Sequence, residues 1–307
     1  MDLTHKARLV ARGNMTEATK EQTFTSVVSR DTVRLFFLLT ALNDLELLSC
    51  IIENAYLAAP NKEKVWMMLT NQLGPEYNGR RAIISKNLYG LRSSGRSFRD
   101  YLAMNLRGWG LTSSKADPYL WMKAAVKPNG DKVYEYVISY VDDLIFHGRD
   151  PKGFMNSLGQ RFTMKPGSIK EPDSHLGVDV KMFCIPDSDD PDKVRRFCIP
   201  DSDDLDKVRW AFESTSYVKK AISDLEKDLG EADLQLLPNA KTPLASGYQP
   251  ELDVSPELGC KQLNYYQGLI GVLRWICKIV RIDILMPVLL MSRNLVSARQ
   301  CRLEQVF

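Results

Sequence analysis

The sequence predicts an α+β fold, with strands and helices mixed in its first half and mainly helices in its last third. Two observations support this prediction: segments up to about residue 146 show either helix-like or strand-like spacing of apolar residues, and three helical patterns lie beyond residue 215. With 44% hydrophobic residues over 307 positions, the chain can bury a core in one large or two modest globular units.

The first predicted helix covers residues 31–42, which open with an aspartate that can cap the helix and then repeat apolar residues at helical spacing. The following segment, 45–57, is rich in strand-forming residues until two alanines and Pro60 interrupt it. We therefore expect a strand that ends near Tyr56.

A second helix is predicted over residues 94–108, where apolar side chains recur four positions apart. Residues 134–146 (YEYVISYVDDLIF) are typical of a β-hairpin. Its turn is expected at the adjacent carboxylates Asp142 and Asp143.

Residues 183–210 contain a tandem repeat of 14 residues, FCIPDSDDPDKVRR followed by FCIPDSDDLDKVRW. Two copies of a unit so rich in proline and aspartate cannot bury a continuous apolar face, so we expect a loop insertion. The aspartates raise the possibility of calcium binding, but their spacing lacks the glycine and the distal glutamate of an EF-hand loop.

Three helices are predicted in the last third. Residues 216–229 are amphipathic, residues 264–280 form a more apolar pattern, and a third helix starts near Asp283 with Pro287 in or near its first turn.

The composition excludes several classes of protein. A net charge of only +3 excludes a histone-like partner, and six scattered cysteines without a C-x-x-C pair, beside three histidines, exclude the usual zinc spacing. The first residues, MDLTHKARLV, lack the apolar run of a secretory signal, and no apolar stretch is long enough to cross a bilayer. We expect a protein that is intracellular, cytoplasmic or nuclear, with reduced thiols and no membrane contact.

The strongest chemical signal is Tyr140-Val141-Asp142-Asp143, flanked by apolar residues on both sides. Two adjacent carboxylates at the tip of an apolar hairpin repel each other unless a cation lies there. Magnesium prefers such oxygen ligands, and two-metal phosphoryl transfer needs several of them from different strands. The alternative is that the two aspartates only form the turn, where Asp is common.

A local excess of positive charge lies between residues 80 and 107, with one acid, Asp100, among seven basic side chains. Such a patch suits a nucleic-acid backbone, although a solvated helix face would look the same. The basic residues are Arg80, Arg81, Lys86, Arg92, Arg96, Arg99 and Arg107.

An ordered set of short motifs resembles copia-type reverse transcriptases of LTR retrotransposons, over nearly the whole chain outside the repeat. In the first half these are His5-Lys6-Ala7-Arg8-Leu9-Val10-Ala11-Arg12-Gly13, Phe24-Thr25-Ser26-Val27-Val28, Asn54-Ala55-Tyr56-Leu57, Leu88-Tyr89-Gly90-Leu91-Arg92, Asp117-Pro118 and Tyr140-Val141-Asp142-Asp143. Later ones are Leu176-Gly177-Val178-Asp179-Val180, Thr242-Pro243, Tyr266-Gln267-Gly268-Leu269-Ile270-Gly271 and Arg281-Ile282-Asp283-Ile284.

The resemblance implies a right-hand polymerase with fingers, palm and thumb, an antiparallel palm sheet and a helical C-terminal part. Such an enzyme uses two Mg²⁺ ions to add dNTPs to a DNA primer on an RNA template, as part of a Pol polyprotein found in virus-like particles. We expect partial fingers and palm in 1–182, the insertion in 183–210 and thumb or connection helices in 211–307. The chain would then be a truncated copy without the ribonuclease H domain.

The resemblance also implies site residues. Asp142 and Asp143 fall on the paired metal-binding and catalytic aspartates, and Tyr56 falls on the aromatic gate below the sugar of the incoming nucleotide. On pattern alone, Tyr56 could equally be a core aromatic on a strand. Lys6 or Arg8 would touch the triphosphate. Three lysines of the 216–229 helix either follow the duplex or are plain surface residues: Lys219, Lys220 and Lys227.

One position departs from the family pattern, because Ile51 stands where the aspartate that bridges both metals is expected. Glu53 would lie on the same side of a continuous strand, but its Cα would be displaced by about 6.6 Å. We therefore expect impaired catalysis in a decayed genomic copy. The alternatives are a non-catalytic nucleic-acid-binding remnant and a translated pseudogene that does not fold.

Overall fold

The protein is described from a computed structural model of the whole chain. The structure describes residues 8–17, 23–43, 45–183, 209–231, 236, 244, 249–279 and 281–304. Contacts divide the chain into two compact units, Met1–Pro172 and Asp173–Phe307. Both units mix helices with antiparallel strands, so the predicted α+β class is confirmed.

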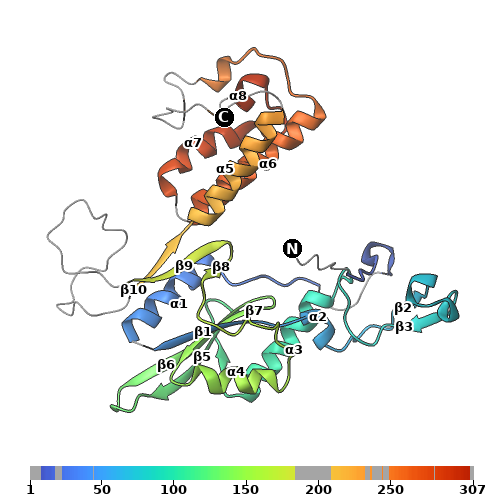
Figure 1. Cartoon of the computed structure of the whole chain (residues 1–307), viewed down its shortest axis with the longest axis vertical. Helices are drawn as coiled ribbons and strands as arrows, with labels where there is room; N and C mark the ends of the chain where they lie inside the picture. The colour runs from blue at the N-terminus through green and yellow to red at the C-terminus, as the bar shows by residue number, and fades with distance from the viewer. Residues whose placement is uncertain are drawn as a thin grey trace. The chain divides into compact units, whose positions relative to one another are not determined.

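The first unit is built on a five-stranded antiparallel sheet in the order β1-β7-β6-β5-β4 (Figure 1). Neighbouring strands β5, β6 and β7 are sequential hairpins, whereas β1 comes from the earlier part of the chain and pairs with β7. The strands are β1 (Glu46–Ile51), β4 (Thr112–Ser113), β5 (Leu120–Val126), β6 (Lys132–Tyr140) and β7 (Asp143–Gly148).

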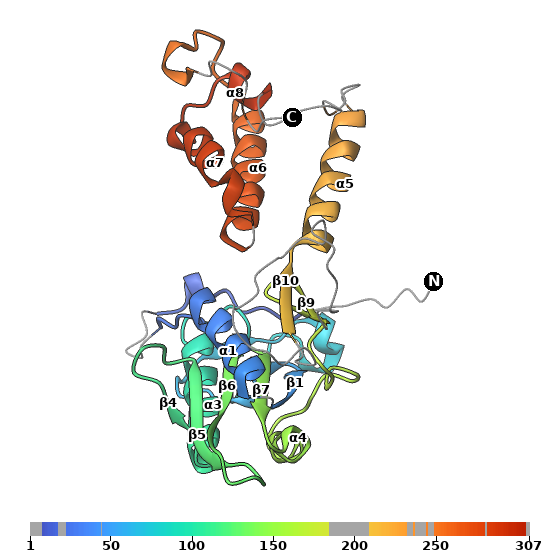
Figure 2. The same cartoon turned by 90° about the vertical axis from the view of Figure 1, so that its left-hand side faces the viewer.

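Helices cover both faces of this sheet. Helices α3 (Ser94–Gly108) and α4 (Pro151–Gly159) bury one face, where Phe98 and Leu158 pack with Leu144 of β7. Helix α1 (Arg30–Asn43) lies over strands β6 and β7 (Figure 2), and Phe36 of α1 meets the ring of the buried His147 edge-on at 5.0 Å. The apolar spacing in the sequence predicted both α1 and α3.

The predicted β6–β7 hairpin is confirmed. The two residues between the strands are Val141 and Asp142, and Asp143 is the first residue of β7. Val141 has a φ of 57°, a left-handed conformation that a β-branched residue rarely adopts. Backbone strain of this kind is typical of functional sites.

The predicted strand over 45–57 is wrong in its second half. Strand β1 ends at Ile51, the chain turns through Glu53, and Asn54 adopts a left-handed conformation with a φ of 50°, which Asn tolerates better than most residues. Residues Ala55–Ala58 then form the short helix α2, which carries Tyr56. The alternation that would have placed Glu53 beside the predicted metal site therefore does not exist.

The rest of the first unit includes a separate two-stranded ribbon, β2 (Trp66–Met68) and β3 (Arg81–Ile83), which the sequence did not reveal. Short 3-10 turns are η1 (Gly13–Met15), η2 (Asn71–Leu73) and η3 (Pro75–Tyr77). Gly90 is required where the N-terminal segment crosses the turn after β3: its φ is 91°, and a Cβ there would collide with the carbonyl oxygen of Ala11.

The second unit combines a three-stranded sheet with helices, and the predicted helices are found. The strands are β8 (Ser174–His175), β9 (Val178–Phe183) and β10 (Arg209–Glu213). The helices are α5 (Thr215–Glu231), α6 (Cys260–Ile279), α7 (Leu285–Met291) and α8 (Gln300–Glu304), with 3-10 turns η4 (Pro250–Leu252), η5 (Ile282–Ile284) and η6 (Ser292–Asn294). Fully buried Tyr266 anchors their core and donates a hydrogen bond to the Met291 carbonyl at 2.8 Å.

The tandem repeat lies almost wholly outside the described residues, so the predicted loop insertion stays a prediction. Its two ends are described: Phe183 of β9 pairs with Arg209 of β10. None of the helices in the described part of the chain has the length and apolar character that crossing a membrane requires.

Candidate active site at the β6–β7 hairpin

Strand pairing brings the three positions of the predicted metal site together. Ile51 of β1 is paired with Asp143 of β7, and the Ile52 N–H donates to the Asp142 carbonyl at 2.8 Å. Residues directly opposite in an antiparallel pair project from the same face, with Cβ atoms about 4.5–5.5 Å apart. A carboxylate at position 51 would therefore lie beside that of Asp143, where the side chain is now isoleucine.

The number and exposure of the carboxylates at the hairpin decide which metal arrangement Asp142 and Asp143 could hold. Both residues are half-buried at the end of the hairpin, where water can complete a coordination shell. Within the described ranges, no group of three or more His, Cys, Asp or Glu side chains could hold a metal ion. Two neighbouring carboxylates fit one Mg²⁺ that keeps water or phosphate as its other ligands, but they do not fit a bridged pair of ions.

Tyr56 of α2 lies near this hairpin, with its hydroxyl against the first turn of α3. Its ring contacts that of Tyr89, with centroids 4.8 Å apart, and that of Phe98 at 6.2 Å. A Cβ on Gly95 would stand 3.7 Å from the Tyr56 hydroxyl, an ordinary van der Waals contact, so this hydroxyl lies close to the start of α3. Burial raises the pKa of Tyr56, and the charge of the nearby Asp142 adds to the effect. Tyr56 thus packs on the core while its hydroxyl feels the charge of Asp142.

Arg8 joins the same group of side chains through Tyr89. Its guanidinium carbon lies 5.2 Å from the centroid of the Tyr89 ring, a cation–π distance. A parallel bridge between Val10 and Tyr89, with a 2.7 Å hydrogen bond from the Ala11 N–H to the Tyr89 carbonyl, holds this segment in place. Lys6, the other residue predicted near the triphosphate, lies outside the described residues.

Tyr89 is the residue that sequence reasoning missed. The motif Leu88-Tyr89-Gly90-Leu91-Arg92 predicted no role for it, yet its ring contacts both the predicted gate Tyr56 and the predicted phosphate contact Arg8. The position of an aromatic residue beside the conformationally special Gly90 was the available signal.

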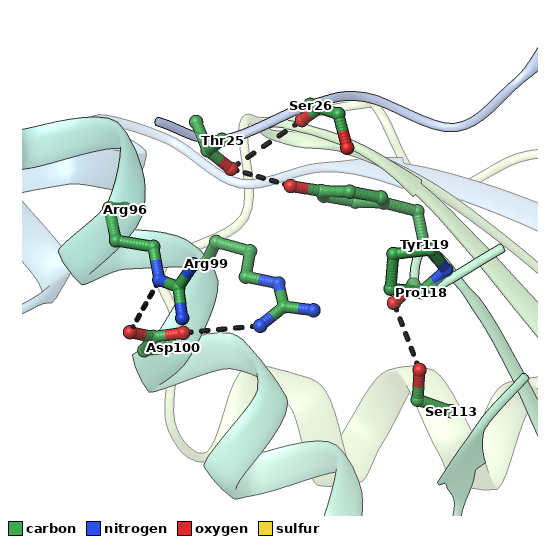
Figure 3. Close-up of polar contacts among 8 residues, drawn as sticks. All are labelled: Thr25, Ser26, Arg96, Arg99, Asp100, Ser113, Pro118 and Tyr119. Carbon is green, nitrogen blue, oxygen red and sulfur yellow. Dashed lines mark hydrogen bonds and ion pairs between the residues drawn. The ribbon is translucent and has the colours of Figure 1, made fainter. Parts of the chain in front are cut away.

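The predicted basic patch is divided between elements. Arg96 and Arg99 of α3 share the carboxylate of Asp100, at 2.9 and 3.2 Å, and the Arg99 guanidinium also lies over Tyr119 (Figure 3). Burial raises the pKa of Asp100, but the hydrogen bonds and charges of the two arginines outweigh it, so the net direction is downward. One net positive charge therefore remains on this half-buried cluster.

The other basic residues of the patch have different settings. The Arg92 Nε donates to the Gly13 carbonyl at 2.8 Å, so this side chain holds the N-terminal segment. Arg80 and Arg81 are exposed at the β2–β3 ribbon, and Lys86 is exposed beyond it. The lysines predicted to follow a duplex are exposed on α5 of the second unit: Lys219, Lys220 and Lys227.

Asp117 of the Asp117-Pro118 motif has a structural role. This buried carboxylate accepts hydrogen bonds from the Ser29 N–H at 2.9 Å, the Thr32 hydroxyl at 2.6 Å and the Tyr119 N–H at 2.9 Å. Burial raises the pKa of Asp117, but these hydrogen bonds outweigh it and lower the pKa overall. The motif therefore ties the start of α1 to the start of β5.

Comparison with known proteins adds an independent finding. Residues 1–184 match the family model described as reverse transcriptase (RNA-dependent DNA polymerase). The Transposon Ty1-NL2 and Ty1-DR1 Gag-Pol polyproteins of Saccharomyces cerevisiae are each 23% identical over 308 residues, which cover 92% of this chain and 15% of each relative. The Transposon Ty1-DR5 Gag-Pol polyprotein of the same yeast is 26% identical over 196 residues, which cover 58% of this chain and 10% of the relative.

Proposed function

The chain belongs to the reverse transcriptase (RNA-dependent DNA polymerase) family, and from this membership we propose that it is the polymerase region of a copia-type Gag-Pol polyprotein in which catalysis is impaired. The motif-based resemblance to copia-type reverse transcriptases is confirmed at the level of the family. The chain spans only 15% of the Ty1-NL2 relative, so activity, substrates and partners are part of the proposal.

The proposed reaction joins a dNTP to a DNA primer on an RNA template, in a right-hand layout of fingers, palm and thumb. The five-stranded sheet would serve as the palm, with Asp142 and Asp143 as the residues that hold Mg²⁺. When bound, the metal would neutralise charge on the transferring phosphate. The protein's own part is mainly to position the primer and the nucleotide.

The nucleotide would enter between the hairpin and the aromatic pair. Tyr56 and Tyr89 offer two rings in tilted contact beside Asp142, and Arg8 above Tyr89 offers a cation for the triphosphate. We assign the gate to Tyr56 and the phosphate contact to Arg8, with Lys6 as a further candidate.

The observation that carries the proposal of impairment is the pairing of Ile51 with Asp143. Position 51 is the one place on β1 from which a third carboxylate would face the hairpin pair, and isoleucine offers no ligand. Glu53 cannot replace it by strand alternation, because β1 ends at Ile51. Loss of one member of a catalytic group typically costs several orders of magnitude in rate.

Primer extension tests this proposal. The natural chain, Ile51→Asp and the neutral control Ile51→Asn are compared on an RNA template with a DNA primer, dNTPs and Mg²⁺. We expect extension to rise at least about a hundredfold in Ile51→Asp and to stay at background in the other two. Full activity of the natural chain would refute the impairment, and inactivity of a folded, template-binding Ile51→Asp chain would refute the assignment of the site.

A second function, nucleic-acid binding without turnover, is favoured for the natural sequence by the same isoleucine. The arginine cluster of α3 keeps a net positive charge that does not depend on the metal site. Binding to a primer–template duplex should fall steeply as salt rises. Absence of binding at low salt would remove this second function.

A further inference from the structure

The β2–β3 ribbon presents an exposed apolar face that the proposed polymerase function does not account for. Register pairs Trp66 with Ile83 and Met68 with Arg81, so these four side chains share one face, while Met67 and Ala82 share the other. The first face is open to solvent: Trp66 is 56% exposed, Met68 57% and Ile83 50%. In Figure 1 the ribbon stands apart from the five-stranded sheet.

Basic side chains bracket this apolar face. The Nζ of Lys64 lies 5.8 Å from the centroid of the Trp66 ring, and Arg81 continues the face on the other strand. Arg80 is exposed beside it. Between residues 62 and 86 the sequence has five basic and two acidic side chains. The face therefore combines a flat aromatic surface with cations on either side of it.

We propose that this ribbon face binds a single-stranded nucleic acid, with a base stacked on Trp66 and the neighbouring phosphates contacted by Lys64 and Arg81. A flat aromatic ring within a cationic surface is what sequence-tolerant single-strand binding requires, because every base has a π-face and every phosphate a negative charge. A protein partner would be expected to cover an apolar face with fewer charges at its centre. The inference rests on the proposed function in that the ligand would be the unpaired part of a template.

Fluorescence anisotropy of a labelled 12-nucleotide oligo-uridylate tests the inference with the whole chain and no catalysis. Trp66→Leu should raise the dissociation constant by between about fivefold and a hundredfold, the range for the loss of one stacked base. Trp66→Phe should retain most of the affinity, because a ring remains. Tyr134→Leu is the matched control: Tyr134 is 49% exposed on β6, away from this ribbon, and its removal should change nothing.

The dependence of oligonucleotide affinity on salt distinguishes the contribution of base stacking from that of phosphate contacts. Arg81→Gln should reduce the slope of log affinity against log salt by about 0.7, the value for one phosphate contact on a single strand, whereas Trp66→Leu should leave the slope unchanged. Because both side chains are exposed, thermal midpoints should stay at the natural value, which shows that any loss is not unfolding.

Two results would overturn the inference. One is unchanged oligo-uridylate binding in a folded Trp66→Leu chain. The other is a change in sedimentation mass in Trp66→Leu without a change in binding, which would make the face a protein contact. Primer extension by Ile51→Asp is measured in parallel. If Ile51→Asp does not extend the primer but Trp66→Leu weakens oligo-uridylate binding, only the polymerase proposal is contradicted. If Ile51→Asp extends the primer but Trp66→Leu leaves binding unchanged, only the ribbon proposal is contradicted.

Discussion

Replacement of the buried His147 should remove a large part of the acid sensitivity of the fold. The imidazole is fully buried between the ring of Phe36 and the stacked ring of Tyr136, each at 5.0 Å. Neither ring nitrogen has a hydrogen-bond partner among the residues that the structure describes. The protonated form therefore has nothing to compensate its loss of water.

The size and sign of the effect follow from the pKa. Burial lowers the pKa of His147 from 6.5 to about 4. As pH falls, His147 takes up a proton in the unfolded chain before it does so in the folded protein. The free energy of unfolding is therefore unaffected by His147 above about pH 7 and decreases as pH falls from 6.5 towards 4. A difference of about 2.5 in pKa corresponds to about 3 kcal/mol below pH 4, and to about 2 kcal/mol at pH 5.

Urea denaturation of the natural chain and of His147→Leu and His147→Phe, at pH 7.5 and pH 5, measures this effect. Other groups titrate equally in all three chains, so the difference between natural and variant isolates His147. We expect the natural chain to lose about 2 kcal/mol more than either variant between these two pH values. Equal losses in all three chains would refute the argument, because they would mean that the buried imidazole either finds a partner or is hydrated when protonated.

Three further predictions concern the frame around the candidate site. Gly90→Ala should destabilise the protein by at least about 1–3 kcal/mol, because of its positive φ and the collision with Ala11, whereas Gly108→Ala, with open space around it, should be neutral or stabilising in thermal melts. Asp117→Asn should cost about 1.5–3 kcal/mol at pH 7 in urea titrations, and this cost should shrink as pH falls below 3.8 towards the depressed folded pKa, because the natural carboxylate loses its contribution to stability as it becomes protonated. Deletion of residues 184–197, one repeat unit, should raise the free energy of unfolding in urea titrations by about 0.7 kcal/mol, because a shorter loop costs less entropy to close. A fall of several kcal/mol would show that the repeat packs on the fold.

Several elements could be predicted from the sequence because their signals are local. Helices α1, α3, α5 and α6 carry apolar residues at helical spacing, and the β6–β7 hairpin carries strand formers on both sides of a polar pair. The strand over 45–57 was predicted too long because the strand formers Ile52 and Tyr56 follow β1 and no glycine or proline interrupts the chain before Pro60. Asn54 was the one local sign of the turn, and a single Asn is a weak signal.

The missing parts of the candidate site depend on contacts between distant segments. Strands β2 and β3 have three residues each and pair across a long loop, so no local pattern marks them. Counting charges grouped Arg80 with Arg96, although the fold places them on different elements. Arg92 was counted among the residues of the nucleic-acid patch, but its Nε donates to the Gly13 carbonyl, 79 residues earlier in the chain.

The pairing of Phe183 with Arg209 has a consequence for how such a gene can change. The duplicated stretch leaves the second sheet at Phe183 and returns at Arg209, the partner of Phe183, so an in-frame duplication between these two residues leaves the pairing of β9 with β10 unchanged. The strand pairing itself therefore gives selection no reason to remove the duplication. Between two strands that pair in this way, the chain can become longer over successive generations while the pairing of the strands stays the same.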